Sequence, residues 1–467
     1  MQTNRKHLDP EMKKIHFIII AVVVVVALLT TLCIVRWHAW FGKIDESTYT
    51  TEQTIDRLVI NMGENGFNSR TITWRCGDSL TQSEVRIKLE NTKDVTVIPA
   101  EGTLVSTQGG SNAYYKAYVT LPQGYYVYQV ASGEETSPWY QMHIVENNSK
   151  CTFLVSGDIQ DWEDNVTDTI LHGLYRRYPS ADFIAFLGDL IHRPLNDSWN
   201  LWFSEMDSLS ACIPHLAIPG NHEYTKGRKG IIDPRWQHTF AHPNNGPDIK
   251  QGESYYLDMP SVRLIMLDTK GLKRPKDYRR TRLWINSLIE SNERPFCIVM
   301  MHHPVKSESL GRMSFMERHY FKKVLSKTDA VLQGHDHSYA RYCTKSHNEP
   351  TTPVYILTTN SEKHYLSRCS RKADRVACGE RLYQVVEATE NQLRISTYLT
   401  HGHELYDVVL IEKDENGHPT ITAENALSEE HLLIPPYFEG KKSYKVIRYN
   451  RCRELREQAL KHRANKK

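Results

Sequence analysis

Side chains that can bind metal ions follow five apolar runs of the sequence, either directly or after a Gly. Backbones turn sharply at such Gly positions, and ligands bind at the carboxyl ends of strands in open α/β sheets. Carboxylate, amide and imidazole groups together can hold two divalent or trivalent ions, a carboxylate such as Asp189 can bridge them, and His suits Zn, Fe or Mn. Two ions ~3.5–4 Å apart hold a phosphate, activate a bridging water and stabilise both in-line oxygens. The candidate ligands are Asp158, Asp189, Asn221, His302, His335 and His337.

No single one of these motifs is specific by itself. Gly-Asp occurs by chance, and Gly334-His-Asp-His337 alone could be a turn with two exposed imidazoles. An isolated His such as His172, His215 or His319 is expected to be a surface or packing residue. His401-Gly-His403 lies between two strand-like runs and is expected in a hairpin turn, not at a metal. The ordered series of five motifs, each at the end of an apolar run, is what predicts a metal site.

The series resembles the calcineurin-like metallophosphoesterase superfamily and, within it, the purple acid phosphatases. The resemblance extends over roughly Thr48 to Ile411, and it includes the β-rich region before the first motif. The matching blocks are Gly157-Asp158, Gly188-Asp189-Leu-Ile-His192, Gly220-Asn221-His222-Glu223, Val299-Met-Met-His302 and Gly334-His335-Asp-His337-Ser-Tyr-Ala-Arg341.

The resemblance implies a metal-dependent phosphoric ester hydrolase that acts on phosphate monoesters or diesters. A hydroxide bridging two ions would attack phosphorus in line, without a phosphoenzyme. His222 and His303 are the candidate catalytic residues: His222 contacts the phosphate or protonates the leaving group, and His303 orients the ligands or forms the wall of the site. The resemblance assigns one ion to Asp158, His192 and His337 and the other to Asn221, His302 and His335, with Asp189 bridging them.

The sequence departs from the purple acid phosphatase pattern at one ligand. Those enzymes have a Tyr three residues after the second Asp, and its charge transfer to ferric iron gives the colour, whereas this chain has His192. Imidazole can fill the same coordination position, so the expected site holds two ions (Fe, Zn or Mn), lacks the colour and is less suited to trivalent iron. The alternative is that His192 is a solvent-facing loop residue. Arg341, after the last motif, is expected to have a structural role.

The elements that position these residues begin with an apolar segment near the N-terminus. Residues 15–35 contain only His16, Thr30 and Thr31 as polar residues, and a helix of that length spans a bilayer core of roughly 30 Å. The basic residues before it predict a cytoplasmic N-terminus (1–14) and an extracytoplasmic body, periplasmic or extracellular. The prediction is a single-pass signal anchor, and the alternative is a cleaved signal peptide.

The rest of the chain divides into three predicted parts. Residues 48–148 alternate with period two between turns, as in a β-sandwich, and resemble the fibronectin-type-III-like domain of the family. Residues 151–424 are predicted to form the catalytic domain, an α/β (α+β) fold with two-layered mixed β-sheets flanked by helices. Residues 425–467 form a basic C-terminal extension, expected to be a solvated helix or a frayed tail.

Composition limits the other functions. A net charge of +3 gives no reason to expect a nucleic-acid partner. Eight of nine Cys follow the apolar segment, with Cys369 and Cys378 the best candidate disulfide and Cys297 a buried thiol. The predicted partners are a phosphate-ester substrate and the membrane, whereas the oligomeric state cannot be predicted. The alternative function is a cell-surface binding or scaffold protein with a hydrolase-like body.

Overall fold

The computed structural model describes residues 10–41, 45–144, 150–160, 166–226, 230–249, 252–346, 349–424 and 429–464. The chain divides into two units, residues 1–45 with 225–230, and the remainder, and each is described by itself. Predictions for residues 1–9, 145–148, 425–428 and 465–467 lie outside the described residues.

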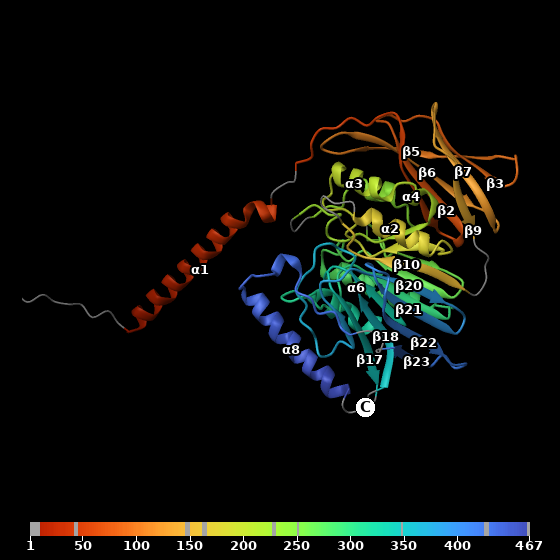
Figure 1. Cartoon of the computed structure of the whole chain (residues 1–467). Coiled ribbons are helices and arrows are strands. Elements are labelled where there is room, and N and C mark those ends of the chain that lie inside the picture. Colours follow the sequence, from red (N-terminus) through yellow and green to blue (C-terminus); the bar gives the residue numbers. More distant parts are fainter. Residues whose placement is uncertain are drawn as a thin grey trace, which may run out of the picture. The chain divides into compact units, whose positions relative to one another are not determined.

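The apolar N-terminal segment forms one long helix, α1 (Pro10–Phe41, Figure 1). Within it, Lys14–Trp37 has a mean hydropathy of 3.3 over its most apolar window, none of which is buried. At ~1.5 Å per residue these 24 residues are long enough to cross a membrane. Length and composition are those of a signal anchor, but a cleaved signal sequence has them as well.

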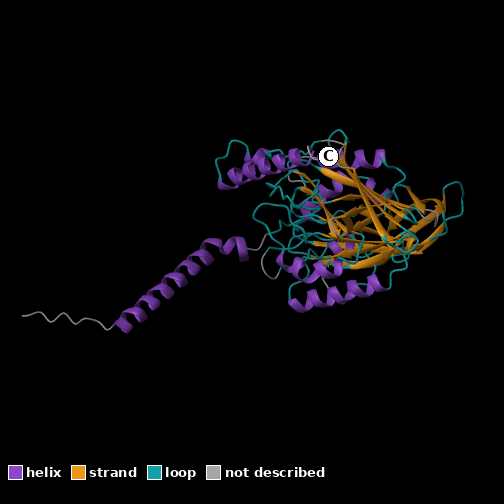
Figure 2. Cartoon of the chain, turned by 90° about the horizontal axis from the view of Figure 1, so that it is seen from below, coloured by secondary structure: helices purple, strands orange, loops and turns teal. Residues whose placement is uncertain are grey.

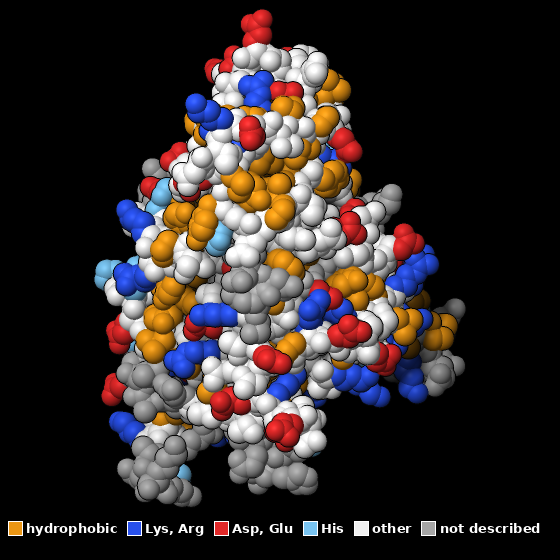
Figure 3. Space-filling view, turned by 90° about the vertical axis from the view of Figure 1, so that its right-hand side faces the viewer, with side chains coloured by type: hydrophobic (Ala, Val, Ile, Leu, Met, Phe, Trp, Pro, Cys, Tyr) orange, Lys and Arg blue, Asp and Glu red, His pale blue; other side chains and the backbone are white. Residues whose placement is uncertain are grey.

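The β-rich region after α1 folds as two antiparallel sheets around a core that includes Trp74, Tyr128 and Val85. Alternation along β3 buries Val85 and Ile87 and leaves their neighbours half-buried, which is the period-two pattern of the sequence. Apolar side chains also gather toward the end of the molecule that bears this region, at the top of Figure 3. The strands are β1 (Ile55–Gly63), β2 (Gly66–Cys76), β3 (Ser83–Leu89), β4 (Thr96–Pro99), β5 (Glu101–Ser106), β6 (Ser111–Thr120), β7 (Gly124–Ser132), β8 (Glu135–Thr136) and β9 (Tyr140–Ile144).

The following region is built on two further layers of mixed sheet. The first layer contains the parallel strands β10 (Cys151–Ser156), β11 (Phe183–Phe186) and β12 (His215–Ala217), and the antiparallel strands β20 (Leu382–Ala388), β21 (Gln392–Leu399), β22 (Leu405–Lys413) and β23 (Pro419–Glu424). The second contains β13 (Tyr255–Asp258), β14 (Val262–Leu267), β15 (Phe296–Met301), β16 (Ala330–Gln333), β17 (Tyr339–Ser346), β18 (Glu349–Leu357) and β19 (Arg375–Ala377).

Helices cover the outer faces of these two layers (Figure 2). Along β15, Phe296, Ile298 and Met300 pack between the sheets, whereas Cys297, Val299 and Met301 pack under the helices. Both faces are buried, which explains why the sequence shows a continuous apolar run here. The helices are α2 (Val166–Arg177), α3 (Asn196–Met206), α4 (Leu209–Cys212) and α5 (Trp236–Thr239) along the first layer, and α6 (Pro275–Glu290) and α7 (Phe315–Leu325) along the second. The predicted α/β architecture is confirmed.

The β-rich region and the α/β region share a sheet and side-chain hydrogen bonds, so they are not joined by a linker alone. Strand β1 pairs in parallel with β12, with Asn61 opposite His215, so that one sheet of 11 strands runs through both regions. Thr73 Oγ1 donates to the carbonyl of Thr239 (2.7 Å), and Tyr128 Oη donates to that of Ala211 (2.6 Å).

A second connection lies where the chain enters the body. The carboxylate of Glu46 accepts backbone N–H bonds from Gly109 (3.0 Å) in the β-rich region and from Asn196 (2.8 Å) in the α/β region. It also accepts a bond from the guanidinium of Arg235 (2.6 Å), which is paired with Asp233 (2.9 Å).

The C-terminal extension forms a helix that is largely exposed, as expected, but one face of it is docked on the body. After η1 (Pro436–Phe438), helix α8 (Tyr444–Ala464) packs on the second layer, with Tyr449 fully buried. Arg456 is 2% exposed and pairs with Glu430, so a cation of this basic segment is part of the folded core. This docking could not be predicted from the basic composition of the segment, because composition does not show which Lys or Arg has a buried acidic partner.

The cysteines also differ from expectation. Cys369 and Cys378 are both buried free thiols, so the pairing favoured by their spacing is not formed. Burial raises the pKa of Cys297 to about 12, which fits the buried thiol predicted for that strand.

Candidate metal centre

All five predicted motifs lie directly after the strands expected to position them. Asp158 follows β10, Asp189 follows β11, Asn221 follows β12, His302 follows β15, and His335 follows β16. These strand ends come from both layers, so the loops of the two sheets converge on one site.

Several candidate ligands have left-handed backbone conformations, which residues other than Gly rarely adopt. The φ angles are 55° at Asp158, 55° at Asp189, 76° at His335 and 46° at His337. Such conformations cost of order 1–3 kcal/mol each and persist where the surrounding structure imposes them. Gly188 has a φ of 84°, and a Cβ there would lie 2.5 Å from the nitrogen of Gly220, so two of the loops touch backbone to backbone.

One cluster of potential ligand atoms consists of Asp158, Asp189 and His337, which are all buried. Their ligand atoms lie within 4.8 Å of one another, with His337 Nε2 3.6 Å from Asp158 Oδ1. The carbonyl of Lys363 accepts the hydrogen bond of His337 Nδ1, which leaves Nε2 available to a metal ion.

The second cluster is centred on His302 Nε2. That atom lies 3.3 Å from Asn221 Oδ1, 3.3 Å from Asp189 Oδ2 and 3.2 Å from His335 Nδ1. His302 Nδ1 is bonded to the carbonyl of Leu187 (2.8 Å), so the ring presents Nε2 to the site. Asp189 therefore reaches both clusters, as a bridging ligand must.

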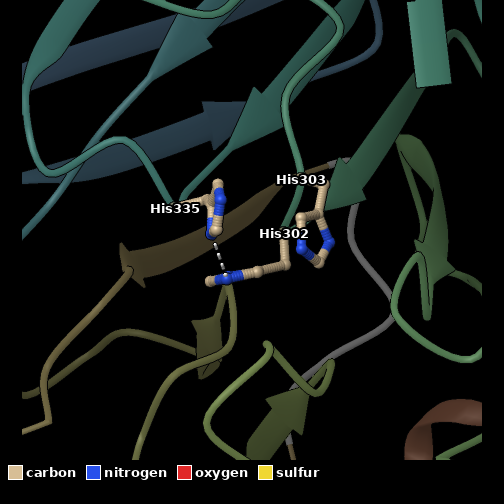
Figure 4. Close-up of side chains that lie close together, drawn as sticks. All are labelled: His302, His303 and His335. Atoms are coloured by element: carbon tan, nitrogen blue, oxygen red, sulfur yellow. Dashed lines mark hydrogen bonds between the residues drawn. The ribbon is translucent and has the colours of Figure 1, made fainter. Parts of the chain in front are cut away.

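His303 lies beside the second cluster, and Figure 4 shows its ring next to those of His302 and His335. The ring centroids are 5.0 Å from His302 and 4.5 Å from His335. Thr269 Oγ1 is 2.9 Å from His303 Nδ1 and fixes the ring. This position is compatible with the predicted wall of the site, and also with a further ligand.

His222 and His192 lie together at the edge of the site. His222 Nε2 is 3.9 Å from Asp189 Oδ2, and its Nδ1 is 2.6 Å from the backbone carbonyl of His192. The two imidazole rings are 5.4 Å apart, and both side chains are half-buried. His192 is not a member of either described cluster, so its role as a ligand stays a prediction.

Comparison with known proteins agrees with this geometry. Residues 151–339 match the family model described as calcineurin-like phosphoesterase.

The chain has a calcineurin-like phosphoesterase domain.

The phosphoesterase domain has plant relatives. Purple acid phosphatase 23 of Arabidopsis thaliana is 27% identical over 231 residues, which cover 46% of this chain and 47% of that protein. Purple acid phosphatase 15 of the same plant is 23% identical over 231 residues, covering 41% and 42%. The chain thus spans less than half the length of these curated relatives.

A solved structure shows the same fold over a longer stretch. The structure titled "Structure of PhoD" has a TM-score of 0.58 and 11% sequence identity, and covers 89% of this chain and 100% of that one. At this identity the likeness concerns the fold alone.

The electrostatics of the phosphoesterase domain favour a cation between the clusters. Burial would raise the pKa of Asp189, but His302 and His222 hold it well below its usual range. Burial opposes a charge on His302, yet the pKa of that ring is raised to about 9 by Asp189. The proton on His302 thus compensates the negative charge of Asp189. A metal ion bound between the clusters would compensate the same charge in its place.

The donor set fits metal ions. Burial lowers the pKa of His337 to about 3, and burial with the neighbouring His303 and His302 lowers that of His335, so both rings are neutral as ligands must be. Carboxylate, amide and imidazole donors suit Zn, Fe or Mn, as the sequence predicted.

Glu223 had no predicted role, but its side chain supports two of the loops that carry candidate ligands. Its buried carboxylate accepts N–H bonds from Gly220 (2.6 Å), Asp189 (3.0 Å), Leu190 (2.7 Å) and Ile191 (3.2 Å). Burial and the nearby Asp189 raise the pKa of Glu223 to about 7. The position of Glu223, two residues after the candidate ligand Asn221, could have indicated this role. Loops at strand ends leave backbone N–H groups unpaired, and a carboxylate nearby can accept their hydrogen bonds.

Arg312 was also missed. Its Nη1 lies 3.0 Å from His335 Nε2 and donates to the carbonyl of His335 (3.1 Å), and its guanidinium lies 4.1 Å from the ring centre of Tyr365. Arg312 belongs to a loop without periodicity, and no pattern in the sequence singles it out.

Other residues that were considered lie away from the clusters. His403 lies in the turn between β21 and β22, where its Nδ1 is 3.2 Å from Tyr383 Oη. Arg341 forms a buried ion pair with Asp407 (2.7 Å), as expected of a structural residue.

Proposed function

We propose that the chain is a metal-dependent phosphoester hydrolase of the purple acid phosphatase type, acting on phosphate monoesters or diesters. We further propose that α1 anchors it in a membrane and that the phosphoesterase domain lies outside the cytoplasm. The observation that supports hydrolysis best is the convergence of three other donors on His302 Nε2, all within 3.3 Å.

The proposed residue roles follow from the two clusters. Two ions would supply Lewis-acid stabilisation of the phosphate and an activated water for in-line attack. Asp158, His337 and His192 would hold one ion, and Asn221, His302 and His335 the other, with Asp189 between them.

His222 is the proposed proton donor. Its Nδ1 is engaged by the carbonyl of His192, so Nε2 is the nitrogen on the side of Asp189. When protonated, Nε2 can donate its proton to the departing alkoxide. His303, fixed by Thr269, would position neighbouring ligands and exclude water from that side.

The alternative is a binding or scaffold protein with a hydrolase-like body. Decayed sites lose ligands or lose their convergence, whereas here the predicted positions are filled and six of the seven lie at the two clusters. The ligand set therefore favours the enzyme.

Hydrolysis can be tested on the full chain purified in a nonionic detergent. We expect p-nitrophenyl phosphate or bis-p-nitrophenyl phosphate to be hydrolysed, activity to be lost on chelation, and metal re-addition to restore it. Asn221→Ala should lower kcat/KM by about a thousand-fold, because it removes a ligand oxygen. Asn391→Ala, at an exposed turn, is the matched control.

A folded chain that binds metal but hydrolyses neither ester would decide for the scaffold. An Asn221→Ala variant with wild-type turnover and metal content would instead contradict the ligand role of Asn221.

A further inference from the structure

A cavity of about 770 Å³ lies beside the segment that follows His302. Residues 305–307 and 313–315 of that segment line one side, helix α7 lines another, and residues of β17 and β18 close it. None of the described metal-centre residues lines this cavity.

The lining is strongly basic. Seven of its side chains are Lys or Arg, and Asp374 is the one acidic residue among the described lining residues. Asp374 already faces Lys345, at 3.9 Å. The whole chain has a net charge of only +3, so this lining is far more basic than the average surface of the protein. The six remaining cations are Lys306, Arg318, Lys322, Arg368, Arg371 and Lys372.

Lys306 is the most enclosed ammonium group of the cavity. Its Nζ lies 5.7 Å from the ring centre of Tyr342 and 5.4 Å from that of Tyr355. Burial lowers the pKa of Lys306, as do the neighbouring Lys322 and Arg318. No ion pair of Lys306 is found among the described residues. The carboxylate of Glu308, two residues along the chain, is bonded to Tyr342 and to Ser367 (2.9 Å).

Arg368 is held in place without a carboxylate partner. Its Nη2 donates to the backbone carbonyls of Ser309 (3.1 Å) and Arg312 (2.6 Å). These bonds fix the guanidinium, and no ion pair of Arg368 is found in the described part of the chain, although the charge of the buried Glu308 acts on it at longer range. A fixed guanidinium without a contacting carboxylate can receive an anion.

We propose that this cavity binds a small polyanion with at least two phosphate or sulfate groups, at a site separate from the metal centre. One anionic group would meet Lys306 and Arg368, and a second would meet Arg318 and Lys322 on the exposed face of α7. Binding would offset the mutual repulsion of these six cations, none of which forms an ion pair with a carboxylate among the described residues. Met313 and Phe315 are 84% and 70% exposed at the rim, so the ligand also has an apolar part beside its anionic groups.

The proposal does not depend on hydrolysis and can be tested with a probe that a phosphoesterase cannot cleave. Naphthalenetrisulfonate combines clustered anions with an apolar ring, and its fluorescence reports binding to the full chain in nonionic detergent. We expect it to bind more tightly than naphthalenesulfonate, with an affinity that falls steeply as salt is raised.

Variants locate the site. Arg318→Gln/Lys322→Gln removes two charges from α7 and should weaken binding about ten-fold. Lys306→Met should weaken it as well while keeping the side chain's packing on the rings. The control Arg279→Gln/Arg282→Gln removes two exposed charges from α6, outside the cavity, and should leave the affinity unchanged. Equal weakening by control and test variants would overturn the proposal, as would equal affinity for the two probes.

Competition identifies the source of the anionic groups. Inorganic tripolyphosphate represents a free ligand, and detergent micelles doped with phosphatidic acid represent a lipid headgroup. Displacement of the probe by one competitor, lost in Lys306→Met, supports the site and assigns its ligand. Displacement by neither would contradict it.

Discussion

At the scale of single residues, Glu223 explains how strained ligands stay in place. Asp189 has a left-handed backbone, yet its N–H and those of the next two residues are bonded to one buried carboxylate. The same carboxylate binds Gly220, directly before Asn221. Glu223 thus couples a ligand of each cluster through main-chain bonds.

Glu223→Gln should weaken metal binding and leave the fold intact. Gln keeps the size of the side chain, but its NH2 group cannot accept a hydrogen bond, so at least one N–H is left unpaired. Loss of an outer-shell partner typically costs 10–100-fold in metal affinity or activity, and we expect an effect of about that size. Titration with metal should show a right-shifted curve that reaches near wild-type kcat at saturation.

The matching control is Glu317→Gln, which removes a buried carboxylate bonded to Tyr278 on the second layer. If both variants respond to metal alike, Glu223 has no special positioning role.

His192→Ala tests the departure from the purple acid phosphatases. If His192 is a ligand, the variant should lose chiefly the ion shared with Asp158 and His337, because imidazole loss leaves that ion under-coordinated. The wild-type enzyme should be active and lack the visible charge-transfer band, with two metals per chain. His192→Tyr, supplied with iron, should partly restore binding and introduce colour. Unchanged metal content and activity in His192→Ala would mean that it is a loop residue beside His222.

The residues of this site were predictable to different degrees. Asp158, Asn221 and His335 stand at the ends of apolar runs, and the ordered series of such ends, not any one of them, predicted a site. Arg312 reaches His335 through the fold of a loop that has no pattern of its own. Contacts of that kind depend on tertiary structure and are not encoded in spacing.

At the scale of elements, strand β12 joins the β-rich region to the phosphoesterase domain through a buried His. His215 is fully buried, with its ring 5.5 Å from that of Phe186 and 6.3 Å from that of Trp202. The sequence left open whether His215 is a surface or a packing residue, and the structure shows that it packs; burial lowers its pKa to about 4. The ordinary value of about 6.5 returns on unfolding.

His215 should therefore make the protein less stable in acid. Between pH 6.5 and pH 4 the unfolded state binds the proton and the folded state does not, so stability falls as the pH falls. The contribution is about 2 kcal/mol between pH 7 and pH 5. His215→Phe should unfold with a smaller pH dependence, measured as the shift in thermal midpoint between these pH values. Equal shifts in variant and wild type would show that other groups cause the acid sensitivity.

Single strands were easier to predict from the sequence than the way in which strands and helices pack together. The strand patterns of β3 and β15 follow from which faces are buried. The pairing of β1 with β12 depends on one parallel bridge between segments about 150 residues apart, and the docking of α8 depends on Arg456 finding Glu430. Neither has a local signature.

At the scale of the whole molecule, the proposed topology can be tested on intact cells. If α1 is an uncleaved anchor with the body outside, added protease should release a soluble active fragment that begins after about Phe41. Substitution of the basic residues before the apolar segment 15–35 should reduce correct orientation, because those charges direct the N-terminus to the cytoplasm. Protection of the body in unbroken right-side-out vesicles would reverse the topology.

The contacts of Glu46 have a mechanical consequence for a tethered enzyme. If α1 is anchored as proposed, any tension along the tether enters the body at this residue, directly after Asp45. Its carboxylate passes the load at once to Gly109 on one side and to Asn196 and Arg235 on the other. The force is thus shared by side-chain and loop bonds before it can peel β1 away from the shared sheet. Tyr49 and Thr51 add further bonds between Glu46 and β1, to Gly109 (3.0 Å) and Asn112 (2.8 Å). We therefore expect the loops behind β12 that carry the candidate ligands to be shielded from this force.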